Sequence, residues 1–183
     1  MAELDTFRLK PGDPAPAFSL PGTDGRTWTL ADFADRELLL VIFWCNHCPY
    51  VQAWEGRAVD LGHRYGSKGV GIVLINSNDA SAYPTDGFEA MVARAREKRY
   101  PFPYLRDETQ ETAHAYGALV TPHPILFDRQ RRLLFQGRID DSHDHPERVR
   151  ERYVEWALDQ ALDGKAVRPA ALPVVGCTVK WRS

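Results

Sequence analysis

The chain has 183 residues, a length that suits one domain with a sizeable hydrophobic core. Its 23 Lys and Arg residues against 25 Asp and Glu give a formal net charge of -2, which offers no electrostatic reason to expect binding to nucleic acid or to an anionic membrane. The longest apolar run, residues 38–44, is far too short to cross a bilayer.

The N-terminal residues 1–10 contain no apolar segment of the kind that a secretory signal peptide requires. We therefore expect a cytoplasmic protein. The chain has three cysteines, and in a reducing cytosol a close cysteine pair is more often redox-active or metal-binding than part of a structural disulfide framework.

The first predicted element is a small hairpin, because the turn-forming residues 21–25 separate two short runs, 17–20 and 27–30. The apolar run 38–44 follows without alternation, which is typical of a strand buried on both faces of a parallel sheet.

An amphipathic helix ending near Gly66 comes next, predicted by apolar residues at spacings of three and four: Val51, Trp54, Ala58, Leu61 and Tyr65. Residues 70–76 form a second buried strand. Asp86 with Glu89 resembles a capping box, which would open a helix with an inner face of Phe88, Met91, Val92 and Ala95.

The C-terminal half is predicted to contain a helix over 108–116, a hairpin of strands 125–127 and 133–136, and a last helix ended by Gly164. We expect the tail, residues 166–183, to be extended. This order of elements predicts a single domain over 1–183 of the α/β class, with a central mixed sheet flanked by helices.

The strongest chemical signal is the pair Cys45 and Cys48, placed between the first buried strand and a helix. A Cys pair with two intervening residues brings two sulfurs within disulfide reach, and the helix N-terminus stabilises a thiolate. We expect Cys45 to have the lower pKa and Cys48 to be more buried. His47, between them, is expected to favour the Cys45 thiolate and so make the disulfide more oxidising.

A zinc site is the alternative for this pair. Structural zinc needs four ligands, and only Cys177 and the H-x-H pair His143 and His145, which has no adjacent Cys, remain as partners. We therefore expect no metal and no organic cofactor.

The element order with a Cys pair after the first buried strand resembles the thioredoxin superfamily. The hairpin at the start and an insertion of about 30 residues after the second core strand are similar to its peroxiredoxin and TlpA-like branch. Residues 43–51, 137–142 and 176–181 resemble a thioredoxin-like family of the AhpC/TSA (redoxin) grouping, most specifically through the Cys45-Asn46-His47-Cys48 run and the Pro, Tyr and Val that follow it.

This resemblance implies a cis peptide bond between Thr121 and Pro122, opposite the Cys pair, where its neighbours hydrogen-bond an extended substrate. His123 is then either in contact with substrate or an exposed loop residue. The acidic residue that thioredoxin buries below its first Cys would fall near Leu39, which is apolar, so proton transfer to Cys48 needs another base or water.

Peroxiredoxins carry Thr or Ser three residues before the peroxidatic Cys and Pro four residues further back. Counting back from Cys45 gives Ile42 and Leu38 instead, and counting from Cys48 gives Cys45 and Val41. The resemblance to the AhpC/TSA grouping therefore does not imply efficient peroxidase activity.

The function predicted from the sequence is thiol–disulfide exchange with a partner protein or a small thiol. Cys45 attacks, Cys48 resolves the mixed disulfide, Trp44 supplies a hydrophobic rim, and the Thr121–Pro122 loop orients the substrate. Cys177 is a candidate third redox cysteine. The alternatives are a thiol peroxidase of the peroxiredoxin type and a non-enzymatic metal-binding module.

Overall fold

The computed structural model describes residues 6–183, so part of the prediction about residues 1–10 lies outside the described residues. The predicted hairpin is present: β1 (Ser19–Pro21) pairs antiparallel with β2 (Thr27–Thr29), and a short 3-10 helix η2 (Leu30–Phe33) follows. No helix in the described part of the chain is long and apolar enough to span a membrane.

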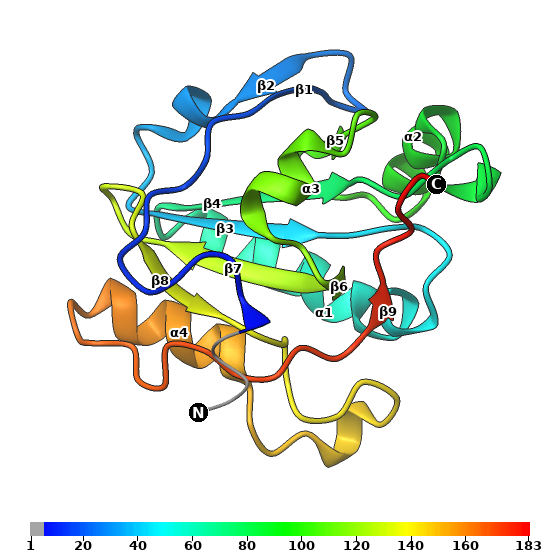
Figure 1. Ribbon diagram of the computed structural model, residues 1–183. Helices are drawn as coiled ribbons and strands as arrows, with labels where there is room; N and C mark the ends of the chain where they lie inside the picture. Colours follow the sequence, from blue (N-terminus) through cyan, green and yellow to red (C-terminus); the bar gives the residue numbers. More distant parts are fainter. Residues whose placement is uncertain (1–5) are drawn as a thin grey trace.

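The central sheet has five strands in the order β5-β4-β3-β7-β8 (Figure 1). They are β3 (Leu38–Phe43), β4 (Val70–Asn76), β5 (Tyr104–Arg106), β7 (His123–Phe127) and β8 (Leu133–Gln136). The β3–β4 and β4–β5 pairs are parallel, whereas β3–β7 and β7–β8 are antiparallel. The mixed α/β sheet predicted from the order of elements is confirmed.

Strand β3 is buried on both faces, as its apolar run predicted. Alternate side chains point to opposite faces of a strand, so Leu38, Leu40 and Ile42 share a core with helices α1 (Pro49–Gly66) and α4 (Tyr153–Leu162). Leu39, Val41 and Phe43 share the other core with the N-terminal segment and α3 (Glu111–Tyr116), which crosses the front of the sheet in Figure 1. Helices on both faces fix the carboxyl end of β3, where the Cys pair begins.

The insertion after β4 holds a 3-10 helix η3 (Pro84–Asp86), helix α2 (Phe88–Glu97) and the edge strand β5. The predicted capping box is wrong: Gly87 is the N-cap of α2, and Asp86 is completely buried and bonded elsewhere. Met91 is buried as expected, but Phe88 is 38% exposed and is not part of the inner face. Helix α3 starts at Glu111, later than expected, because Gln110 before it has a left-handed backbone with φ of 66°.

The C-terminal residues run back to the part of the molecule that holds the Cys pair. After a short 3-10 helix η4 (Pro146–Arg148) and α4, the chain reaches β9 (Cys177–Thr178), which pairs antiparallel with β6 (Val120–Thr121). In Figure 1 the red C-terminal segment runs from beside β6 up to α2. The tail is therefore docked against the strand that leads into the Thr121–Pro122 bond.

Candidate active site

The Cys pair lies where β3 passes into α1. Cys45 follows the end of the strand by two residues, and Cys48 is the N-cap of α1 with Pro49 in its first turn, where a missing backbone N–H costs nothing. All three cysteines are free thiols, and Cys45 and Cys48 are 1% and 0% exposed. Both cysteines are thus buried to almost the same extent, although Cys48 was expected to be the more buried of the two.

The Thr121–Pro122 bond is cis, as the resemblance implied. Thr121 meets both sulfurs: its Oγ1 lies 3.2 Å from Cys45 Sγ, and its carbonyl oxygen lies 3.3 Å from Cys48 Sγ, from which it accepts a hydrogen bond when Cys48 is a thiol. A residue 73 positions further along the chain than Cys48 therefore completes the site.

The two thiols influence each other strongly, and their pKa values shift in directions opposite to those expected. A hydrogen bond from Cys45 lowers the pKa of Cys48, and the Val51 N–H in the first turn of α1 lowers it further. The same hydrogen bond raises the pKa of Cys45, helped by burial and by the carboxylate of Asp86. Cys48, and not Cys45, is the N-cap residue of α1, so the positive end of the helix lies nearer to the Cys48 sulfur.

Asp86 is the residue that sequence reasoning missed. It comes from η3 and is fully buried, and its Oδ1 accepts a hydrogen bond of 2.6 Å from the backbone N–H of Asn46. Its Oδ2 bonds the Nδ1 of His47 and accepts a bond of 3.0 Å from the Asn78 amide. The carboxylate therefore holds both residues between the cysteines.

Asn46 is also fixed from the edge of the sheet. The Tyr104 hydroxyl donates to Asn46 Oδ1 at 2.8 Å, and Asn46 Nδ2 donates to the carbonyl of Thr85 at the same distance. Because Tyr104 lies in β5, the insertion is what supports the loop between the cysteines. Its position in a strand of three residues explains why no sequence pattern pointed to it.

His47 is 27% exposed and lies flat against Tyr83, with ring centroids 5.1 Å apart and an angle of 6° between the rings. Its bond to Asp86 pairs the imidazole with a carboxylate. Any positive charge on His47 is thus balanced locally, and its effect on the Cys45 thiolate depends on Asp86 as well.

A metal ion could be held by Cys45, His47 and Asp86, whose ligand atoms all lie within 4.8 Å of one another. Within residues 6–183 no other group of three His, Cys, Asp or Glu residues is arranged in this way, and neither His143 nor His145 takes part. Sulfur, imidazole and carboxylate are donors that zinc accepts, and a fourth ligand would still be needed for the tetrahedral geometry of a structural site.

Two sequence-based expectations are wrong because the side chains are buried. Trp44 is 0% exposed and donates from Nε1 to the Tyr100 hydroxyl at 3.1 Å, so it belongs to the core and forms no rim. His123 is also completely buried, accepting a bond from the Leu119 N–H and lying 3.2 Å from Gln136 Oε1. Burial lowers the pKa of His123 to about 4.

Cys177 lies beside the pair. It is the strand partner of Thr121 and packs against the core cluster that contains Cys45 and Cys48, close enough to the Cys48 thiol to lower its pKa. Burial, followed by this contact with Cys48, raises the pKa of Cys177 to about 11.

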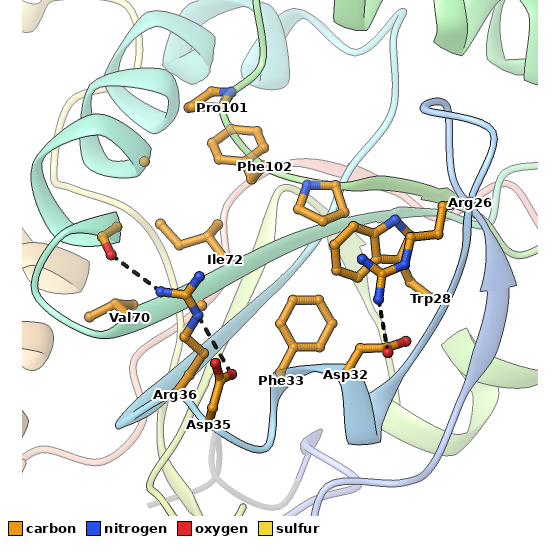
Figure 2. Close-up of a pocket in the computed structure, with 14 residues that line it drawn as sticks. Arg26, Trp28, Asp32, Phe33, Asp35, Arg36, Val70, Ile72, Pro101 and Phe102 are labelled. Atoms are coloured by element: carbon orange, nitrogen blue, oxygen red, sulfur yellow. Dashed lines mark hydrogen bonds and ion pairs between the residues drawn. The ribbon is translucent and has the colours of Figure 1, made fainter.

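The pocket drawn in Figure 2 is not part of this site. Its volume is about 370 Å³, and it is lined by the end of α1, the start of β4 and residues 101–103. Its charged groups are paired, Arg26 with Asp32 at 3.0 Å and Arg36 with Asp35 at 3.9 Å. The Cys pair precedes the other end of α1, about 27 Å away along a helix of this length, and the pocket contains no thiol.

Comparison with known proteins supports a redox assignment. Residues 11–136 match the AhpC/TSA family. A Mycobacterium tuberculosis protein with the name "Putative peroxiredoxin" is 30% identical over 116 residues, which are 62% of this chain and 67% of that protein.

Two solved structures are similar over most of the chain. An uncharacterized conserved protein from Geobacillus kaustophilus is 40% identical, with a TM-score of 0.89 over 96% of this chain and 95% of that one. The thioredoxin domain of a thiol-disulfide oxidoreductase from Bacteroides vulgatus is 20% identical, with a TM-score of 0.60 over 70% of this chain and 88% of that one. The second likeness identifies the fold as that of thioredoxin.

Proposed function

The chain belongs to the AhpC/TSA family, and from this premise we propose that it is a thiol–disulfide oxidoreductase acting through Cys45 and Cys48. The observation that carries the proposal is the contact of both sulfurs with Thr121, the residue before a cis proline. The substrate is a disulfide or dithiol of a partner protein, or a small thiol.

In the reducing direction Cys45 attacks one sulfur of the substrate disulfide. Cys45 gives its proton to the Cys48 thiolate, whose pKa is lowered, the Cys45–substrate bond forms, and the other substrate sulfur leaves as a thiolate. That thiolate takes the proton back from Cys48, which then attacks Cys45 and releases the second substrate sulfur. The substrate gains two electrons and the enzyme is left with a Cys45–Cys48 disulfide; the reverse sequence oxidises a dithiol.

This assignment of roles follows from the surroundings of the two sulfurs. Cys48 is enclosed by the helix N-terminus, Thr121 and Cys177, whereas Cys45 lies next to Asn46 and the partly exposed His47. Thr121 Oγ1 is placed to donate to the Cys45 sulfur as negative charge develops there.

Thiol peroxidase activity is the second candidate, favoured by the name of the Mycobacterium tuberculosis relative. The Thr and Pro that activate peroxide in peroxiredoxins are replaced by Ile42 and Leu38, which are both buried apolar residues of β3. A peroxide would have to be polarised by another group, and Thr121 offers a hydroxyl 3.2 Å from the Cys45 sulfur.

A trapping experiment tests the proposal and separates the two candidates. In the Cys48→Ser variant Cys45 should still attack but nothing resolves the product, so mixed disulfides with client proteins or small thiols accumulate on a non-reducing gel. The Cys45→Ser variant should trap far less, because Cys48 lies at the start of α1 beneath Thr121 and the tail that pairs with it. Cys45 sulfenic acid without trapped partners would assign peroxidase chemistry, and stronger trapping by Cys45→Ser would reverse the two roles.

A further inference from the structure

Hydrogen bonds made by residues before and after Cys177 in the sequence hold it near the Cys pair. Upstream, the Leu172 N–H donates to the Gln136 carbonyl at 3.0 Å, and downstream the Lys180 N–H donates to Asn78 Oδ1 at 2.9 Å. The Lys180 carbonyl in turn accepts bonds from Asp79 N–H and Gln110 Nε2. These anchors place β9 in one register on β6, with Cys177 opposite Thr121.

The approach of the tail to the cis bond is unusually close. A Cβ atom added to Gly176 would lie 2.3 Å from the Thr121 carbonyl oxygen and 3.3 Å from the Pro122 nitrogen, so only glycine fits there. The tail therefore lies on the loop that contacts both sulfurs of the pair, and the next residue after this glycine is a cysteine.

We propose that Cys177 is a third redox residue, which exchanges a disulfide with the Cys45–Cys48 pair through Cys48. The proposal rests on the proposed function, because it uses the Cys45–Cys48 disulfide as its starting point. Its own basis is the pairing of Cys177 with Thr121, which contacts both sulfurs, and the packing of Cys177 against the core cluster that contains both cysteines.

The exchange needs no external oxidant. The Cys177 sulfur attacks Cys48, the Cys48–Cys177 bond forms, and the Cys45–Cys48 bond breaks with Cys45 as the leaving thiolate. The proton lost by Cys177 is taken up by Cys45, so the number of electrons in the protein is unchanged. The product keeps its oxidising equivalents as a Cys48–Cys177 disulfide while Cys45 returns to a thiol that can form another mixed disulfide.

The direct test uses the Cys45→Ser variant of the full chain, which retains Cys48 and Cys177. Mild oxidation with diamide followed by non-reducing peptide mapping should find a Cys48–Cys177 disulfide within one molecule. The matched control is Cys48→Ser, in which Cys45 and Cys177 should form no internal bond. A Cys45→Ser protein whose two thiols stay free, or join only different molecules, overturns the proposal.

A second arm uses wild-type protein, so that it does not depend on the folding of a variant. After two-electron oxidation, alkylation with iodoacetamide should label Cys45 in part of the molecules, and this labelling should be lost in oxidised Cys177→Ser. Equal labelling of Cys45 in the two proteins would overturn the redox role of Cys177. It would leave the proposed Cys45–Cys48 disulfide unaffected. Absence of any Cys45–Cys48 disulfide in Cys177→Ser would instead overturn the proposed function.

Discussion

Asp86 and His47 bond each other beside the Cys45 sulfur, and the two side chains should affect the reduction potential in opposite directions. Asp86→Asn removes a negative charge that disfavours the Cys45 thiolate, so it stabilises the dithiol form and raises the potential. His47→Gln leaves the carboxylate unbalanced and lowers it. One pKa unit is about 1.4 kcal/mol, or about 30 mV for this couple, which is the expected size of each shift.

Equilibration with glutathione buffers measures both shifts, with Asp60→Asn, an exposed carboxylate on α1, as the control. The contrary outcomes are a shift of the reduction potential in the same direction in both variants and a potential equal to that of the wild type. Either result would contradict the opposite effects expected of Asp86 and His47.

His123 should make stability depend on pH. Its pKa is about 4 in the folded chain, against about 6.5 for an exposed histidine, so the unfolded state binds its proton at higher pH. The contribution to stability is complete above about pH 6.5 and is lost as the pH falls toward 4, by up to about 3 kcal/mol. Urea unfolding between pH 4 and 7 should therefore show a slope that His123→Gln reduces and that the exposed control His145→Gln retains.

At single residues, sequence reasoning succeeded where the information is local. The Cys pair and the cis Thr121–Pro122 bond lie in short recognisable patterns. Asp86 was misread because Asp followed by Glu three residues later has the form of a helix cap, and only the fold brings it to Asn46 from 40 positions away. His123 and Trp44 were misjudged for the same reason, since burial depends on the whole core.

Among the elements, the two-residue pairing of β6 with β9 has the most consequence for the site. Gly176→Val would place side-chain atoms against the Thr121 carbonyl, so the tail should leave β6, at a cost of about 1–3 kcal/mol. Cys177 should then be alkylated faster, and amide hydrogen exchange at Val120–Thr121 should rise while the central sheet stays protected.

The control for that variant is Gly56→Ala, because a Cβ there meets no atom within 4 Å and lies inside α1. Replacing a helical glycine by alanine should stabilise the protein by roughly 0.5–1 kcal/mol and leave Cys177 unchanged. Slow alkylation of Cys177 in Gly176→Val would show that the close approach does not hold the tail.

Helices and strands with a long sequence pattern were predicted more accurately than those with a short one. Strands β4 and β8 were predicted with the observed bounds, and β3 to within one residue, because apolar runs of this kind are unambiguous. Strands β5, β6 and β9 have two or three residues, too few to show a period, and their pairing depends on contacts distant in sequence. Those three strands carry Tyr104, Thr121 and Cys177, so much of the site was beyond sequence reasoning.

Across the whole molecule, the site draws on four separate parts of the chain: the junction of β3 and α1, the insertion, the cis-proline loop and the tail. The fold brings these parts together at the carboxyl end of β3 (Figure 1). This arrangement places polar groups of the insertion and of the cis-proline loop around two buried sulfurs.

The central claim is that Cys45 and Cys48 interconvert between dithiol and disulfide, and the reduction potential of this couple in the Cys177→Ser variant tests it most directly. Protein equilibrated with chelator and a series of glutathione buffers is alkylated and mapped by mass spectrometry. We predict a single two-electron transition to a Cys45–Cys48 disulfide, at a potential above the roughly -270 mV of thioredoxin. Two thiols that stay fully alkylatable across the whole series, or that are protected by stoichiometric zinc when chelator is omitted, would contradict it.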